Sequence, residues 1–453
     1  AVFALPPVRA QQFGGALALG EEELLVGETR NEAWPGQVYV YRVNAEGVWE
    51  EAQRLTVPRA KEPDGFGRAL ALDGDRLLVG ANLSDREAGA AYVFERNGAG
   101  RWGLVTRLAT GGAGARFGTS VALAGETALV AAPRQGEVGA VYVYRRTEWG
   151  NWVQAARLEA PGGQPGDRFG TGLATDGTTV LVGAPGRGYV DVFRQKTAGS
   201  WEHVTRWEGP GSDAGFGTRV LLNGSMAFVA APGAGGGVGA VFVYQETEDG
   251  VTWALRDVLG PFILEPARLG SALALEGDHL WVGAPFTRSG GAVVRFHRGA
   301  KGAWDAVDVY VDTLDAGAAR LGSTLAVGYG WAAVGAVGVD NGAGAVRVLA
   351  QDNTTWQPVQ LIAPPLRHFE PVTGGAVACE KGMAAAFPCD RVDLLAFLPV
   401  QNFGGGRGTE TNDVWGWTDP ETGREYAIVG RTDGTAFVDI TDPYHPVFLG
   451  DLP

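Results

Sequence analysis

Histidine is the side chain best able to bind a metal ion or carry a proton near neutral pH. The chain has five histidines, and they lie far apart, without a metal-ligand spacing such as His-Glu-x-x-His. Surface or core roles are therefore favoured over ligation, and we predict no metal site. The five are His203, His279, His297, His368 and His445.

Motifs for nucleophilic catalysis and phosphate binding give no better support for an enzyme. The chain has no Gly-x-Ser-x-Gly elbow. The glycine-rich run at 234–237 lies between expected strands, whereas a phosphate cradle needs a helix N-terminus. Asp64, Asp167 and Asp213 precede repeated Phe-Gly pairs, where turn capping explains them better than catalysis. We predict no catalytic residue and no cofactor.

The two cysteines, Cys379 and Cys389, suggest a disulfide if the protein is exported. In the strand assignment given below, however, Cys379 ends one strand and Cys389 follows the next strand, which returns to the opposite end of the hairpin. Their Cα atoms could then lie beyond the roughly 7 Å limit for a disulfide. This assignment disfavours a local disulfide, and the bonding of the two cysteines stays open.

Seven times the chain repeats an opening of phenylalanine or leucine followed by glycine, at intervals of about 50 residues, and a tryptophan follows each opening. A repeat of this length made of short apolar runs indicates one supersecondary unit, usually a propeller blade. The openings are Phe13-Gly14, Phe66-Gly67, Phe117-Gly118, Phe169-Gly170, Phe216-Gly217, Leu269-Gly270 and Leu321-Gly322. The tryptophans are Trp49, Trp102, Trp152, Trp201, Trp253, Trp304 and Trp356.

The third copy shows what one repeat encodes. Its apolar runs at 120–124, 127–132, 140–144 and 152–158 predict a four-stranded antiparallel meander. The second run is apolar on both faces, as in a strand sandwiched between neighbouring sheets, and the fourth alternates, as in an outer strand. The tryptophan at the head of the fourth strand favours packing between blades over a cofactor site.

A degenerate eighth unit is visible at 375–379, 383–387 and 393–398, without a tryptophan-bearing fourth strand. Residues 2–7 resemble the end of a fourth strand and could complete it, closing the ring without a free sheet edge. We predict an all-β, eight-bladed propeller, with seven blades as the fallback. The alternative, an eighth segment that acts as a cap or linker, stays open. The predicted domains are a propeller at 1–400, a glycine-rich linker at 401–411 and a further β segment at 412–453.

Composition limits the partners. The net charge is −14 and no Lys/Arg cluster occurs, so nucleic acid and anionic membrane surfaces are poor partners. No apolar run of 18 residues is present, and we predict no membrane-spanning segment. The chain begins with Ala1 rather than methionine, which fits a mature protein whose signal peptide has been removed, although an edited chain would look the same.

The repeats resemble the bacterial FG-GAP family, relatives of the integrin α-subunit propeller. The resemblance covers residues 13–400 and implies a propeller in an exported or surface protein, commonly one involved in adhesion or recognition. Members that bind calcium insert an Asp-rich loop between the first two strands, whereas this chain has tight turns such as Asp73-Gly74 and Asn223-Gly224. Asp340-Asn341 is best read as a simple turn. The resemblance is carried by Phe117-Gly118-Thr119-Ser120, Val130-Ala131-Ala132-Pro133, Gly139-Ala140-Val141-Tyr142, Gly183-Ala184-Pro185 and Gly283-Ala284-Pro285.

The sequence pattern of residues 412–453 differs from that of the preceding repeats. Asn412-Asp413-Val414-Trp415-Gly416 and Asp439-Ile440-Thr441-Asp442-Pro443 look like the opening of the choice-of-anchor B family of bacterial surface proteins, built on another β-propeller. The resemblance implies one blade of a second propeller. A lone blade exposes two apolar faces, so this segment either continues in further sequence or packs on something else.

These observations favour a non-enzymatic, exported cell-surface protein that recognises or assembles with a protein or glycan. The working surface would be the loops between second and third strands, at 30–35, 82–87 and 286–289, because loops on a rigid scaffold usually carry function. Self-assembly through 412–453 is one variant. The alternative is an enzyme with its site on the propeller axis, quinoprotein-like or glycan-active, which would need histidine, glutamate and arginine side chains converging there.

Overall fold

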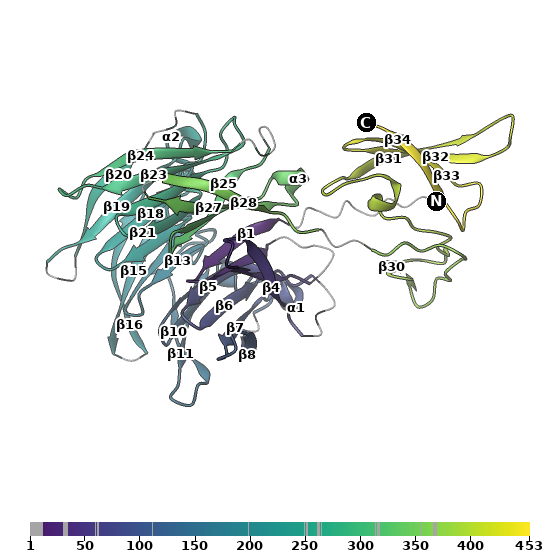
Figure 1. Cartoon of the computed structure of the whole chain (residues 1–453). Helices are drawn as coiled ribbons and strands as arrows, with labels where there is room; N and C mark the ends of the chain where they lie inside the picture. The colour runs from purple at the N-terminus through teal and green to yellow at the C-terminus, as the bar shows by residue number, and fades with distance from the viewer. Residues whose placement is uncertain are drawn as a thin grey trace. The chain divides into compact units, whose positions relative to one another are not determined.

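The computed structural model describes residues 12–29, 35–58, 60, 63–110, 112–197, 199–248, 250, 252–260, 263, 265–312, 314, 318–353, 355–365 and 369–453. They form two compact units, one ending at Ala363 and the other running from Pro364 to Pro453. Both are built from β-strands (Figure 1), which confirms the all-β prediction.

Within its described residues, the first unit consists of seven four-stranded antiparallel sheets, numbered 1 to 7 in chain order. Sheets 1 and 2 contain β1 (Phe13–Leu19), β2 (Glu23–Glu28), β3 (Val38–Val43) and β4 (Trp49–Leu55), then β5 (Phe66–Asp73), β6 (Arg76–Ala81), β7 (Ala90–Arg96) and β8 (Trp102–Leu108). Sheets 3 and 4 contain β9 (Ser120–Ala124), β10 (Thr127–Ala132), β11 (Ala140–Arg146) and β12 (Trp152–Leu158), then β13 (Gly172–Thr175), β14 (Thr179–Ala184), β15 (Tyr189–Thr197) and β16 (Ser200–Glu208). Sheets 5 and 6 contain β17 (Val220–Asn223), β18 (Met226–Ala231), β19 (Ala240–Glu246) and β20 (Trp253–Leu259), then β21 (Ala272–Glu276), β22 (His279–Ala284), β23 (Ala292–Arg298) and β24 (Trp304–Val311). Sheet 7 contains β25 (Leu321–Gly328), β26 (Trp331–Ala336), β27 (Ala345–Asp352) and β28 (Thr355–Ile362).

Each sheet is a meander in sequence order, as the third repeat predicted. The second strand of sheet 3, β10, is buried along its whole length, whereas the fourth strand, β12, is buried at its ends and open to solvent between them. The turns between first and second strands are as tight as predicted, because Asn223 pairs directly with Met226 and Glu276 with His279. Two residues bridge each of these pairs, which leaves no room for a calcium-binding loop.

The Phe-Gly opening of one sheet binds the loop between the second and third strands of the sheet before it. The Phe117 N–H of sheet 3 donates to the Ala88 carbonyl of sheet 2 at 3.0 Å, and Gly89 forms a parallel bridge with Phe117. A Cβ atom at Gly89 would collide with the Phe117 carbonyl oxygen, so this joint requires glycine. The same bridge joins Gly239 to Leu269 and Gly291 to Leu321.

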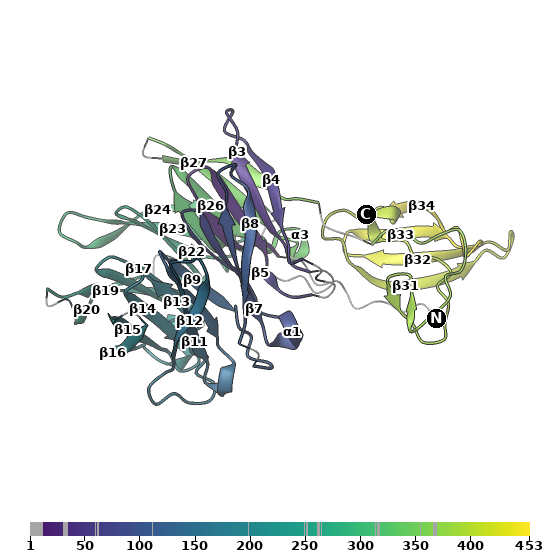
Figure 2. The same cartoon turned by 90° about the horizontal axis from the view of Figure 1, so that it is seen from below.

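Sheet 7 makes this joint with sheet 1. The Phe13 N–H donates to the Ala343 carbonyl at 3.0 Å, and an apolar cluster that includes Leu24 and Val346 spans both sheets. The purple strands of sheet 1 lie beside the green strands of sheet 7 in both views (Figures 1 and 2). The seven first strands contact one another in sequence, and β25 also contacts β1. Sheet 7 therefore packs directly against sheet 1.

The tryptophans at the heads of the fourth strands pack between sheets, as predicted. Trp49 of sheet 1 is 2 % exposed and meets Trp331 of sheet 7 edge to face, with 5.2 Å between ring centroids. Trp281 of sheet 6 and Trp356 of sheet 7 form a similar pair at 4.8 Å. Edge-to-face contacts of this kind are favourable because the positive ring edge meets the negative ring face.

Three short segments drawn as helices lie between second and third strands. They are α1 (Ser84–Glu87), α2 (Ala234–Gly237) and α3 (Val339–Gly342), each with left-handed residues inside, so they act as tight turns. The sequence-based reading of 234–237 as a loop is therefore confirmed. Asp340 and Asn341 are the left-handed residues of α3, which confirms that they form a turn.

The second unit ends in one four-stranded antiparallel sheet, called here the C-terminal sheet. Its strands are β31 (Thr411–Thr418), β32 (Glu425–Arg431), β33 (Gly434–Asp439) and β34 (Val447–Leu452). On one face of this sheet, Ala436 and Val438 of β33 pack against Phe403 of the 3₁₀ turn η3 (Val400–Phe403). Part of the predicted linker at 401–411 is therefore packed against the sheet that follows it.

The predicted eighth blade is wrong for the residues that the structure describes. Instead of a four-stranded sheet, 369–398 contains the two-stranded pair β29 (Met383–Ala384) and β30 (Phe387–Pro388) and three isolated bridges, Val372 to Phe397, Val377 to Leu394 and Glu380 to Met383. This segment belongs to the second unit, so the first unit ends well before residue 400. Residues 2–7, expected to close the eighth blade, lie outside the described residues.

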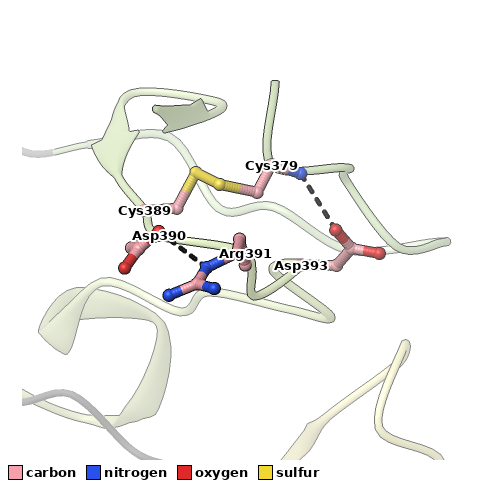
Figure 3. The surroundings of a disulfide bond; sticks show 5 residues. All are labelled: Cys379, Cys389, Asp390, Arg391 and Asp393. Atoms are coloured by element: carbon pink, nitrogen blue, oxygen red, sulfur yellow. Dashed lines mark hydrogen bonds and ion pairs between the residues drawn. A yellow bond between two sulfur atoms is a disulfide. The ribbon is translucent and has the colours of Figure 1, made fainter. Parts of the chain in front are cut away.

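The expectation against a local disulfide is also wrong. Cys379 and Cys389 are bonded, with their Cα atoms 5.9 Å apart (Figure 3). The assumed strand order was the source of the error: the strand leading to Cys379 pairs with the segment at 394, while β29 and β30 form a small hairpin between the cysteines. That hairpin returns Cys389 to Cys379, whose N–H donates to Asp393 Oδ1 at 2.9 Å.

Candidate recognition surfaces

The loop at 82–87, one of the three predicted working loops, is tied to the neighbouring sheets. Glu87 accepts two hydrogen bonds from the Arg116 guanidinium, at 3.0 and 3.1 Å, and this interaction lowers the pKa of Glu87. Asp85 pairs with Arg107 of β8. Glu87 therefore stabilises the joint between sheets 2 and 3, whereas Asp85 pairs within sheet 2. Both acids give this loop a structural role.

The loop at 286–289 offers a more open surface. Phe286 is 46 % exposed, and the guanidinium groups of Arg268 and Arg320 lie 5.0 and 5.6 Å from its ring centroid. Arg268 and Arg320 each precede the opening of their repeat and have left-handed backbones. Of the loop at 30–35, only Pro35 lies within the described residues.

The first strands form the innermost ring of the first unit, because each of them contacts the first strands on either side. No histidine or cysteine occurs on these seven strands. The openings contribute two arginines, Arg68 and Arg219. The Arg219 side chain is accessible to solvent yet surrounded by protein, and this desolvation, together with the charge of Arg68, lowers its pKa. These strands therefore supply no histidine to the cluster of histidine, glutamate and arginine that the enzyme alternative requires.

A buried polar cluster in sheet 4 was not foreseen from the sequence. Asp191 is completely buried and accepts two hydrogen bonds from Arg206, at 2.7 and 2.8 Å, while His203 Nε2 lies 3.0 Å from Asp191 Oδ1. The Arg206 guanidinium lies 3.7 Å from the Tyr189 ring centroid. Burial, followed by the hydrogen bond to Asp167, raises the pKa of Tyr189.

The repeat explains this cluster as packing rather than catalysis. Aligned on the third strand, Asp191 occupies the place of Tyr39 in sheet 1 and Tyr142 in sheet 3. In those sheets Arg54 and Arg157 lie over the tyrosine ring, at 4.7 and 5.6 Å from its centroid. Arg206 is the counterpart of these arginines and pairs with a carboxylate instead. An alignment of the repeats at this position of the third strand would have shown that aspartate replaces tyrosine in sheet 4.

The aspartates before the openings act largely as predicted. Asp64 Oδ1 accepts hydrogen bonds from the N–H groups of Phe66 and Gly36, at 3.0 and 2.9 Å. Asp167 accepts from the N–H of Gln164 and from the Tyr189 hydroxyl, at 2.8 and 2.7 Å. Asp213 lies in the exposed 3₁₀ turn η2 (Ser212–Ala214). Asp64 and Asp167 therefore bind backbone N–H groups of loops, and none of these bonds indicates catalysis.

The described histidines fall in three places. His203 belongs to the Asp191 cluster, and His445 lies on the surface, with its Nδ1 atom 2.9 Å from Asp442 Oδ2. His279 and His297, distant in sequence, lie side by side on adjacent strands with 4.8 Å between ring centroids. Their separation along the chain gave no sign of this contact. His368 lies outside the described residues.

The second face of the C-terminal sheet, called here the aromatic face, has no layer packed on it among residues 369–453. Side chains alternate along β31, which places Trp415 and Trp417 on this face, opposite the Phe403 cluster. Trp415 is 72 % exposed and Trp417 is 49 % exposed. Trp417 stacks on Tyr426 of β32, with 5.4 Å between ring centroids, and Ile428 and Phe437 continue the row beside Trp415.

No three carboxylate, thiolate or imidazole groups are arranged as a metal site in the part of the chain that the structure describes. Over the same residues, no helix is long and apolar enough to cross a membrane.

Comparison with known proteins supports the repeat and the fold. The model of the FG-GAP repeat matches residues 49–94, 105–144 and 152–200, which lie in sheets 1 to 4. The chain therefore contains FG-GAP repeats, in agreement with the resemblance read from the sequence. None of the curated proteins matches the sequence.

Solved structures agree with a propeller-like fold. A protein from Lactobacillus plantarum matches with a TM-score of 0.53 at 14% identity, over 72% of this chain and 92% of its own length. Candidate 6-phosphogluconolactonases from Bacteroides uniformis and Bacteroides fragilis match with TM-scores of 0.52, also at 14% identity, over 72% of this chain and 92% and 90% of theirs. At this identity the likeness concerns the fold alone.

Proposed function

We propose that this chain is a non-enzymatic recognition protein of the cell surface, in which a closed seven-bladed propeller carries a sheet that binds a protein or glycan. The observation that carries the proposal is the aromatic face, with Trp415 72 % and Trp417 49 % exposed. Contiguous exposed apolar surface is uncommon on soluble proteins and often marks an interaction site. Tryptophan is also enriched among the residues that dominate binding energy.

The joint between Gly344 and Phe13 supports closure by seven blades. It repeats the joints inside the ring and leaves no gap for an eighth blade between sheets 7 and 1. A closed ring of this kind leaves no free sheet edge in the first unit. The disulfide between Cys379 and Cys389 supports an oxidising compartment, as expected for an exported protein.

The C-terminal sheet is proposed as one blade of a second propeller of the choice-of-anchor B kind. It has four antiparallel strands in meander order, as a blade requires. One face is covered by η3 and the other presents the aromatic face to a neighbour. The neighbour would be another blade or the surface of a partner, and self-assembly is the variant in which a second copy supplies it.

An axial enzyme is the competing function, and the names of two structural neighbours would suggest a lactonase. Arg68 and Arg219 alone favour it on the described axis, because they could bind an anionic substrate. The seven first strands supply no histidine or cysteine to accompany them. The exposed aromatic face is the stronger observation, so recognition is the function that we propose.

The proposal is tested by double substitution of the aromatic face. Trp415→Ala with Trp417→Ala is compared with Trp149→Ala, which removes a tryptophan that is 87 % exposed in the loop between β11 and β12. We expect binding on a glycan array, or self-association in sedimentation velocity, to fall at least tenfold in the double variant and to persist in the control. Unchanged binding in the double variant would contradict the role of the aromatic face.

The enzyme alternative is tested in parallel with 6-phosphogluconolactone. We expect no hydrolysis above the rate without protein. Hydrolysis that disappears in Arg68→Ala or Arg219→Ala would overturn the proposal and place a catalytic site at the axis.

A further inference from the structure

His279 and His297 are the centre of a row of four side chains across sheet 6. His279 of β22 is the register partner of His297 of β23, and their ring centroids lie 4.8 Å apart. The register continues outward, pairing Glu276 of β21 with His279 and Asp305 of β24 with His297. Because register partners point to the same face of a sheet, two imidazoles lie side by side with a carboxylate at each end.

The ring nitrogens of this pair are not engaged by the protein. His203 and His445 each have a carboxylate oxygen within 3.0 Å of a ring nitrogen. The imidazoles of His279 and His297 form no hydrogen bond or ion pair with any described residue, although both are half-buried. Their nitrogen lone pairs are therefore open to a ligand from solvent.

The equivalent row of side chains in other sheets contains ion pairs. In sheet 1 it contains Glu23 and Arg42, 3.6 Å apart, and in sheet 2 Arg76 and Glu95, 3.8 Å apart. In sheet 6 the row has no arginine or lysine, and its end carboxylates form no ion pair with a described residue. A bound cation would supply the positive charge that arginine supplies elsewhere.

We propose that this row binds one divalent transition-metal cation through His279 and His297. Imidazole ligands suit Zn²⁺, Ni²⁺ and Cu²⁺, whereas Ca²⁺ and Mg²⁺ prefer oxygen ligands. The two imidazoles are already adjacent, and Glu276 or Asp305 would add a carboxylate by side-chain rotation, with water at the remaining positions. The site lies at the end of sheet 6 where Glu276 and His279 flank the two-residue turn between β21 and β22.

The affinity test uses Zn²⁺ titrated calorimetrically into the whole chain. His279→Ala and His297→Ala should each weaken binding at least tenfold, because each removes one of two imidazoles. His445→Ala is the matched control, since it removes an imidazole that already faces a carboxylate, and it should leave the affinity unchanged. Equal losses in all three variants would overturn the proposal. Melting temperatures in EDTA establish that each variant is folded.

A spectroscopic test needs no variant. One equivalent of Cu²⁺ added to the unaltered chain should give an electron paramagnetic resonance spectrum with coupling to two imidazole nitrogens. Glu276→Gln and Asp305→Asn should retain this coupling, because the carboxylates are secondary ligands. A spectrum without coupling to two nitrogens would overturn the proposal.

Discussion

Gly344 of sheet 7 lies directly against Phe13 of sheet 1, as Gly89 of sheet 2 lies against Phe117 of sheet 3. In both places a Cβ atom on the glycine would overlap the phenylalanine carbonyl oxygen, and both glycines have positive φ, +82° and +85°. The joint between the two ends of the first unit is therefore built like an internal one. Such a joint fixes the spacing of neighbouring sheets because it allows only the backbone of each to approach.

Replacing Gly344 by alanine should lower the free energy of unfolding of the first unit by about 3 kcal/mol. Strain at positive φ contributes about 1–2 kcal/mol and overpacking against Phe13 adds to it. Gly330→Ala is the matched control, because Gly330 has φ of +78° and open space around its Cβ position. It should cost only the conformational part, about 1 kcal/mol. Urea unfolding measures both, and equal losses would show that the joint is not tight.

Removing the disulfide by Cys379→Ser with Cys389→Ser should destabilise the second unit by about 2–3 kcal/mol, as loop-closure entropy predicts for a loop of this size. The first unit should be unaffected, since the cysteines lie outside it. Calorimetry with and without reductant measures the effect on each unit. A drop in the stability of the first unit instead would contradict the division at residue 363.

Substituting Asp191 by asparagine should destabilise the first unit by about 3 kcal/mol, because the Arg206 guanidinium would lose its carboxylate partner in a buried site. His203→Asn is the control. His203 is the more exposed partner of Asp191, with 29 % of its side chain accessible, and its loss should cost less than about 1 kcal/mol. Thermal unfolding followed by circular dichroism measures both changes. A milder effect for Asp191→Asn than for His203→Asn would show that Arg206 does not depend on the pair.

The turns of the C-terminal sheet should weaken below about pH 4. A hydrogen bond from the Thr441 side chain, followed by one from the Thr441 N–H, lowers the pKa of Asp439 from its ordinary value of 3.8, and Thr422 does the same for Asp419. A carboxylate with a lowered pKa stabilises the fold above its ordinary pKa, and this contribution is lost as pH falls through the lowered value.

The pH prediction is checked by a nuclear magnetic resonance titration of the aspartate carboxyl carbons. Thr441→Val should raise the pKa of Asp439 towards its ordinary value and leave that of Asp419 unchanged. A parallel shift of both carboxylates would mean that the substitution alters the whole sheet rather than one turn.

The repeat could be read from sequence because its signals are local. Alternation, an apolar second strand and two-residue turns follow from residue types that are close in the chain, so the meander of sheet 3 was predictable strand by strand. The packing of Trp49 and Trp356 between sheets followed from the repeat as well. The prediction of an eighth blade was wrong because its apolar runs have the length and composition of strands but lack the Phe-Gly opening that binds a preceding sheet.

By itself the sequence determined the blade, its strand order and its tight turns, because backbone preferences and apolar periodicity act over a few residues. Only the tertiary structure decided which ends meet. Phe13 with Ala343, Cys379 with Cys389 and His279 with His297 are pairs set by register and by the packing of sheets. Nothing local encodes such a pairing, since its stabilisation comes from contacts that exist only once the neighbouring strands have taken their places.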